Sequence, residues 1–204
     1  QELGVAGGPE VAGAVDGQVV EGAGGGVDPG PGERGGGAAR GGQGEEVEIQ
    51  ANTVAANIAK GLGANYRLLH VSDDLQAETI QSIASEPKIK ELLDLIHQAD
   101  MVLHGIGAAA EVALRRGMNQ DKIAKLLECG AVGEAVGYYF ANDGRLVHAT
   151  SSVGLQLIDL ASVKEVVAVA GGRSKAAAVK AVLLNAPRDV LIIDEAVARG
   201  LLKT

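Results

Sequence analysis

Hydrophobic and polar residues along most of this chain follow two repeating patterns, one typical of strands and one of helices. Short apolar runs predict strands at residues 66–71, 101–106, 166–170 and 190–193. Apolar positions at helical spacing predict helices at residues 45–61, 77–85, 88–98, 119–128, 155–162, 174–186, and from 194 or 195 to 202. Two short β-like pieces within 131–148 flank Asn142-Asp143-Gly144, a strong hairpin-turn signal. This alternation predicts an α/β fold, a mainly parallel sheet with helices on both faces.

The first 44 residues follow neither pattern. They hold seventeen of the chain's 30 glycines, together with Pro9, Pro29 and Pro31. Residues 21–44 therefore predict a glycine-rich loop, while 17–20 suit a short strand. We divide the chain into a glycine-rich segment, residues 1–39, and a domain, residues 40–204. The segment is either a flexible arm or part of the same domain.

The composition of the chain limits the classes of function that are expected. The net charge is -8 and aromatic residues make up 2% of the 204 residues, so this chain is not expected to bind nucleic acid by itself. Its one cysteine, Cys129, excludes an intrachain disulfide and favours a reducing compartment, which predicts the cytoplasm. No apolar run reaches the length of a membrane span, so no membrane association is expected.

The segment after the strand at 166–170 has the features of an anion site. Gly171 and Gly172 end the strand, and Ser174 and Lys175 begin a helical stretch. Unpaired backbone N–H groups and the positive end of the helix dipole meet at such a point, and glycines let an oxyanion approach the backbone. In an acidic chain, this positive corner predicts a phosphate-bearing ligand.

Other candidates depend on how the chain folds. Ligands of parallel α/β sheets bind beyond the carboxyl ends of the strands, and three such exits, at 105–107, 171–175 and 194–195, are expected to line one crevice. Arg40 and Arg115 are further cationic residues. If their side chains lie near the Ser174–Lys175 loop in the fold, together they suit a ligand with two phosphates. Ordinary surface charge is the alternative for both.

Glu134 lies between glycines in an apolar stretch, where it either accepts hydrogen bonds from sugar hydroxyls or occupies a solvated turn. Gln50 is a ligand candidate or a surface residue. The four histidines show no metal-ligand spacing, and His104, inside an apolar strand, is expected to be a satisfied core residue. Nucleophile-elbow and P-loop motifs are absent, so no catalytic residue, metal or cofactor is predicted.

Several motifs in order resemble the effector-binding domain of SorC-type bacterial transcription regulators, and in particular the members that control glycolytic genes. They are ARGGQGEEVEIQAN (39–52), LLHV (68–71), MVLHGIG (101–107), GAVGEAVGYYF (130–140) and VAVAGGRSKAAAVKA (167–181). The resemblance implies a Rossmann-like fold related to sugar-phosphate isomerases. It also implies a non-enzymatic sensor of a phosphorylated sugar, with fructose 1,6-bisphosphate the expected effector.

The resemblance assigns roles to the matching positions, which are Arg40, Gln50, Arg115, Glu134, and Gly171, Gly172, Ser174 and Lys175 of the G-G-x-S-K loop. Arginine and lysine would hold phosphates, and Glu134 sugar hydroxyls. The family's G-G-T-T phosphate loop has its counterpart at residues 24–27, which lack both threonines. DNA would be bound by a separate helix-turn-helix domain, which nothing before Arg40 resembles. A homodimer or larger assembly is expected.

Two other functions remain open from the sequence. One is a sugar-phosphate isomerase-like enzyme on the same fold, for which Glu134 and Asp194 are the only acid/base candidates. The other is an oligomerisation module, which does not exclude sensing.

Overall fold

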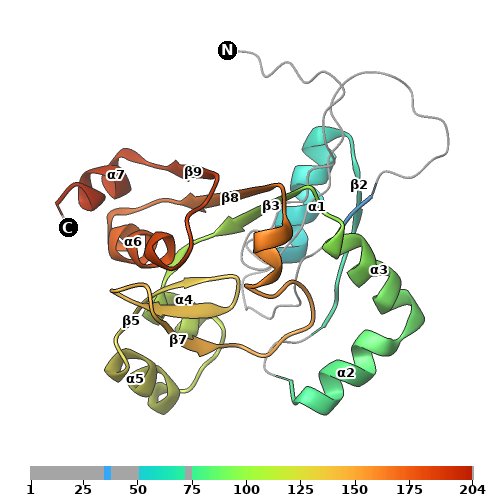
Figure 1. Ribbon diagram of the computed structural model, residues 1–204, viewed down its shortest axis with the longest axis horizontal. Coiled ribbons are helices and arrows are strands. Elements are labelled where there is room, and N and C mark those ends of the chain that lie inside the picture. The colour runs from blue at the N-terminus through green and yellow to red at the C-terminus, as the bar shows by residue number, and fades with distance from the viewer. Residues whose placement is uncertain (1–34, 38–50, 72–74, 204) are drawn as a thin grey trace.

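The computed structural model describes residues 35–37, 51–71 and 75–203, with only the backbone given for 35–37 and 51–52. Within these residues the strands form three sheets (Figure 1). A parallel pair consists of β1 (Gly35–Gly37) and β2 (Asn65–Arg67). A parallel sheet consists, in spatial order, of β3 (Met101–Gly105), β8 (Glu165–Ala170) and β9 (Val190–Ile193). An antiparallel sheet consists of β4 (Gly107–Ala108), β5 (Ala131–Ala135), β6 (Tyr138–Ala141) and β7 (Leu146–Ala149).

Helices connect and cover these strands. The described helices are α1 (Ala51–Leu62), α2 (Ala77–Ser85), α3 (Pro87–His97), α4 (Ala109–Arg115), α5 (Gln120–Glu128), α6 (Ala176–Asn185) and α7 (Glu195–Leu201), with short 3-10 turns η2 (Asp159–Ser162) and η3 (Arg173–Lys175). Figure 1 shows α6 between the parallel sheet and the antiparallel strands. The predicted α/β class, with a parallel sheet flanked by helices, is confirmed.

Local capping signals set several helix boundaries where the sequence predicts them. The side chain of Asn119 accepts a hydrogen bond from the N–H of Lys122 at the start of α5, 2.8 Å long. The Asp194 side chain caps α7 in the same way, accepting from Val197 at 2.8 Å. Pro87 occupies the first turn of α3, where a missing N–H costs no helical hydrogen bond. These boundaries agree with the predicted ones to within one or two residues.

The predicted hairpin turn joins β6 to β7. Gly144 has a φ of 83°, a conformation that glycine adopts readily, and its N–H donates to the carbonyl of Ala141. The Asp143 side chain accepts from the N–H of Arg145 at 3.0 Å, which closes the turn. The sequence predicts two β-like pieces here, whereas the structure has three strands between residues 131 and 149, because β5 also pairs with β6.

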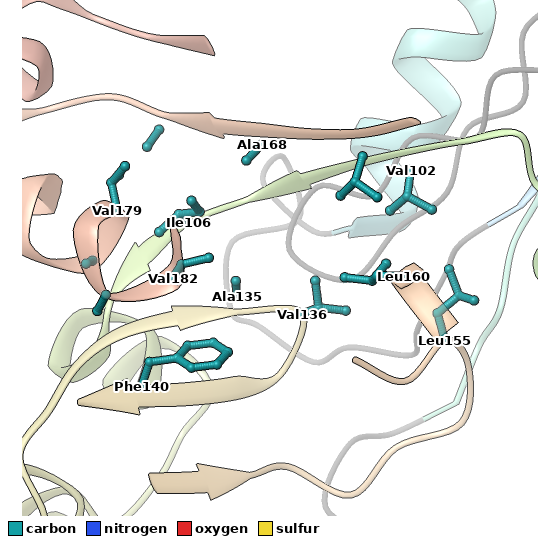
Figure 2. Packing of buried hydrophobic residues seen from close by; sticks show 14 of the residues in the cluster. Val102, Ile106, Ala135, Val136, Phe140, Leu155, Leu160, Ala168, Val179 and Val182 are labelled. Atoms are coloured by element: carbon teal, nitrogen blue, oxygen red, sulfur yellow. The ribbon is translucent and has the colours of Figure 1, made fainter. Parts of the chain in front are cut away.

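One large hydrophobic core joins the two larger sheets through α6. Val179 and Val182 of α6 lie beside Ile106, and Phe140 of β6 packs on the opposite side of the same cluster (Figure 2). Phe140 is fully buried. Buried and half-buried residues alternate along β3, and the buried, even-numbered side chains face this core. The core therefore fixes the antiparallel strands against the carboxyl ends of the parallel ones.

Some predicted elements are shorter than expected. The strand predicted at 66–71 is wrong for 68–71, because β2 ends at Arg67 while Leu69 and Val71 are buried without strand pairing. The helix predicted at 155–162 is reduced to η2, since the Asp159 side chain accepts from the N–H of Gln156 and stabilises a turn instead. The helix predicted at 45–61 is observed from residue 51, and 45–50 lie outside the described residues.

Three elements carry no signal that the sequence patterns detect. Strand β1 consists of three glycines within the predicted loop 21–44, and backbone pairing with β2 needs no side-chain pattern. Strand β4 and helix α4 lie in a short, Ala-rich stretch whose apolar residues show no clear period. The strand suggested at 17–20 lies outside the described residues.

Candidate functional site

The carboxyl ends of the three parallel strands lie side by side. Gly105, the last residue of β3, is in register with Val169 of β8, and Ala170 is in register with Ile193 at the end of β9. The predicted exits at 105–107, 171–175 and 194–195 therefore leave the sheet at the same edge, where α/β sheets bind ligands.

The loop after β8 has the predicted glycine turn and helix start. Gly172 adopts a φ of 96°, which side-chain-bearing residues rarely adopt. The N–H of Lys175 donates to the carbonyl of Gly172 at 3.0 Å, which closes the turn η3 before α6 begins. Ser174 is exposed and Lys175 is half-buried. The side chains of both therefore stand at the N-terminal end of α6, where the helix dipole favours an anion.

Asp194 links this loop to the last strand. Its carboxylate accepts hydrogen bonds from the N–H groups of Val197 and of Gly172, the latter 2.6 Å long. The Val197 and Gly172 hydrogen bonds, with a smaller contribution from the charge of Lys175, hold the pKa of Asp194 below its usual value. Asp194 is thus an ionised capping residue, which is a poor match for the acid/base role considered for it.

Glu134 lies beside the same edge through strand β4. In the antiparallel ladder it faces Gly107, two residues after the end of β3. Its Oε1 accepts from Nη2 of Arg116 at 3.1 Å and from the N–H of Gly137 at 2.5 Å. The side chain of Glu134 is 1% exposed and that of Arg116 is 13% exposed, so they form a part-buried ion pair. The solvated-turn alternative for Glu134 is wrong.

The turn that follows Glu134 is strained. Val136 has a φ of 53°, the one non-glycine residue of the described chain with a positive φ, and its branched side chain is buried. A β-branched residue rarely adopts this conformation. Gly137 is held on both sides, since its N–H donates to Glu134 and its carbonyl accepts from the N–H of Thr150 at 2.8 Å. Strained backbone of this kind tends to cluster at functional sites.

The structure brings part of the predicted site together. Strand β4 pairs with Glu134 and also contacts η3, so Glu134 and the Ser174–Lys175 corner border the same short strand. Arg115 is exposed at the end of α4. Arg40, Gln50 and the loop at 24–27 lie outside the described residues. Arg116 is the residue that sequence reasoning left unassigned, because adjacent arginines give no signal of which one turns inward.

His104 is a core residue, as predicted. Nε of Arg188 donates to its Nε2 at 2.9 Å, and its Nδ1 donates to the carbonyl of Gly105, also at 2.9 Å. Burial, reinforced by the charge of Arg188, lowers the pKa of His104 to about 4. The imidazole is therefore neutral at physiological pH, with its proton on Nδ1.

Other site classes find little support in the described residues. No three His, Cys, Asp or Glu side chains among them gather closely enough to hold a metal ion. No helix in the described ranges is long and apolar enough to cross a bilayer. A cavity of about 260 Å³ lies between α5 and β7, lined among others by Lys125, Cys129 and His148. None of the predicted ligand residues lines it.

Comparison with known proteins places these features in a family. Residues 38–203 match the Sugar-bind family, a sugar-binding domain. Over 165 residues, 81% of this chain and 48% of the relative, the chain is 50% identical to the central glycolytic genes regulator of Priestia megaterium. It is 44% identical, with the same coverage, to the protein of that name from Bacillus subtilis. The chain thus spans about half the length of these relatives.

A solved structure gives the same result. A SorC family transcriptional regulator from Enterococcus faecalis matches with a TM-score of 0.75 and 44% identity, over 82% of this chain and 68% of that chain. The chain therefore belongs to the sugar-binding domain family of SorC-type transcriptional regulators. The resemblance that the motifs indicate is confirmed.

Proposed function

We propose that residues 40–204 form the effector-binding domain of a bacterial regulator of glycolytic genes, preceded by the glycine-rich segment 1–39. The domain binds a phosphorylated sugar, with fructose 1,6-bisphosphate the first candidate. Whether the domain holds this ligand controls DNA binding by a separate helix-turn-helix domain. A regulator of this kind acts in the cytoplasm. The observation that carries this proposal is the loop with Ser174 and Lys175 at the start of α6, in a chain whose relatives are named as glycolytic regulators.

The loop supplies one phosphate subsite. Lys175 forms no ion pair with any described residue, so its ammonium group is available to an anion. The backbone N–H of Gly172 is already bonded to Asp194, and the phosphate is therefore held by the side chains of Ser174 and Lys175, near the dipole of α6. Gly171 and Gly172 let the chain make this approach without side-chain obstruction.

The remaining ligand residues complete the proposal. Arg40, Gln50 and Arg115 serve the second phosphate and the sugar, and Glu134 accepts sugar hydroxyls. Because the side chain of Glu134 is 1% exposed, a ligand reaches it only after the residues that cover it move. Binding is therefore coupled to a change of conformation.

That coupling is what a sensor requires. A ligand regulates only when it binds one conformational or assembly state more tightly than another. We propose that the domain forms a dimer or larger assembly, and that the effector shifts this equilibrium. No cofactor is needed.

Within the described part of the chain, neither acid/base candidate of the enzyme alternative is placed for proton transfer. Asp194 is consumed in helix capping, and Glu134 is paired with Arg116. We therefore propose binding without chemistry. An aldose–ketose conversion assay on pentose and hexose phosphates is expected to show no turnover, and turnover that disappears in Glu134→Gln would establish the enzyme instead.

Titration calorimetry with fructose 1,6-bisphosphate tests the binding proposal. Lys175→Ala removes a phosphate partner and is expected to weaken binding by at least about tenfold, since one such charge-assisted contact contributes about 1.5–3 kcal/mol. Lys88→Ala is the matched control, because Lys88 is an exposed lysine on α3. Absence of binding heat in the wild type, or equal affinities of the wild type and Lys175→Ala, would contradict the proposal.

A further inference from the structure

A cavity outside the proposed effector site lies between α5 and β7, which are neighbours in Figure 1. Its volume is about 260 Å³, just below the range of about 300–1,000 Å³ that is typical of drug-sized ligand pockets. The cavity therefore suits a smaller organic molecule. None of the residues assigned to the sugar phosphate lines it, so a ligand bound there is a second one.

The floor of this cavity is apolar. Leu126 of α5 is buried, and Met118 and Val147 are half-buried. Leu126 belongs to the small hydrophobic cluster between α4, α5 and the antiparallel strands, and Met118 and Val147 pack against that cluster. The floor favours a ligand with apolar surface, because contact removes that surface from water. A methionine thioether also makes favourable contacts with aromatic rings.

The rim of the cavity carries positive charge. Lys122 and Lys125 are exposed and lie about one helical turn apart, so they share the face of α5 that lines the cavity. On the β7 side the rim has the exposed imidazole of His148, whose ring centroid lies 5.7 Å from that of Tyr139. Lys125 forms no ion pair with any described residue, and no described Asp or Glu lines the cavity. In a chain of net charge -8, this rim favours an anion.

We propose that this cavity is a second ligand site, which binds a small organic anion with an apolar body. The body lies on the apolar floor, and the anionic group lies at the rim near Lys125 and His148. A sugar bisphosphate is a different kind of ligand, because its carbon skeleton carries hydroxyls that an apolar floor cannot satisfy. The domain therefore binds two chemically different ligands, one at the start of α6 and one between α5 and β7.

Cys129 allows occupancy of the cavity to be measured. It is the only cysteine of the chain, it is exposed, and it lines the cavity, so its alkylation by iodoacetamide can be followed by mass spectrometry. The anionic probe is 2-naphthoate, and 2-naphthylmethanol is a neutral probe with the same ring system. Saturating 2-naphthoate is expected to slow alkylation at least about threefold, because a pocket encloses most of the surface of its ligand. The concentration dependence of the rate gives the dissociation constant of each probe.

Lys125→Met tests the need for charge, because it removes the ammonium group and keeps an apolar side chain of nearly the same length. The wild type is expected to bind 2-naphthoate at least about threefold more tightly than 2-naphthylmethanol, and Lys125→Met to bind the two equally. Lys88→Met, at an exposed lysine of α3, is the control and is expected to keep the wild-type preference. Each protein is compared with its own alkylation rate without probe. An alkylation rate that 2-naphthoate leaves unchanged, equal wild-type affinities for the two probes, or a preference that Lys125→Met retains would overturn the inference.

Discussion

The carboxylate of Asp194 accepts a 2.6 Å hydrogen bond from the backbone N–H of Gly172 and also caps α7 through Val197. One side chain thereby joins the exits of β8 and β9. This carboxylate occupies one backbone N–H of the glycine loop, whereas the side chains of Ser174 and Lys175 remain at the start of the helix. The loop is consequently braced by the protein itself, and the ligand is not needed to form it.

Asp194→Ala is expected to lower the free energy of unfolding and to loosen the loop, whereas Asp194→Asn, which can still cap α7, is expected to lower it less. Because the pKa of Asp194 is lowered in the folded state, its stabilisation is present above the unfolded pKa. It is lost as the pH falls through the folded pKa. Urea unfolding at neutral and at strongly acidic pH measures this. A gap between the wild type and Asp194→Ala that does not narrow at acidic pH would refute the assignment.

His104 is expected to make the protein sensitive to mild acid. Its pKa is about 4 when folded, below the 6.5 of an unperturbed histidine, so the unfolded chain binds more protons between these values. Stability therefore falls as the pH drops from about 6.5 toward 4, by up to about 3 kcal/mol over the full range. Chemical unfolding of the wild type and of His104→Gln between pH 7 and pH 5 checks this. Parallel pH dependences of the two proteins would show that His104 is not the cause.

Gly133→Ala tests the close approach of β5 and α6. An added Cβ would lie 2.8 Å from Cα and 2.9 Å from the carbonyl oxygen of Ala178, both backbone atoms that cannot give way cheaply. We expect a loss of about 1–3 kcal/mol in unfolding free energy. Gly61→Ala is the control, since a Cβ there meets nothing within 4 Å and alanine favours the helix α1 by about 0.5–1 kcal/mol. A Gly133→Ala protein as stable as the wild type would show that this packing is looser than described.

Ser174→Glu places a negative charge in the proposed phosphate subsite. Ser174 is exposed, so the fold is expected to remain intact while fructose 1,6-bisphosphate binding weakens at least about a hundredfold through like-charge repulsion. Ser151→Glu, also at an exposed serine, controls for the added charge. Calorimetry on both variants gives the comparison, and an equal affinity in the two would place the phosphate elsewhere.

The sequence predicts those parts of the fold that depend on local signals. Asn119 and Asp194 determine helix starts through their own side chains, and Asn142-Asp143-Gly144 forms its turn without help from distant residues. The strand limit at Arg67 and the three-glycine strand β1 depend on pairing between distant segments. Such pairing leaves no pattern within a single segment.

The candidate site shows the same division between features that depend on local sequence and features that depend on contacts between distant segments. The helix-start loop with Ser174 and Lys175 is visible from spacing alone. The burial of Glu134, its partner Arg116 and the bond from Gly172 to Asp194 arise from how strands far apart in the chain meet. Charge in the sequence identifies both Arg115 and Arg116, and only the fold tells that Arg115 is exposed and Arg116 half-buried.

The proposed function requires a sugar phosphate to bind at the start of α6. A crystal structure of the chain with fructose 1,6-bisphosphate is the decisive experiment. We expect a phosphate with oxygens about 2.7–3.2 Å from Oγ of Ser174 and Nζ of Lys175, with the sugar directed toward Glu134. Ligand density in the cavity between α5 and β7 instead, with none at Ser174, would contradict it.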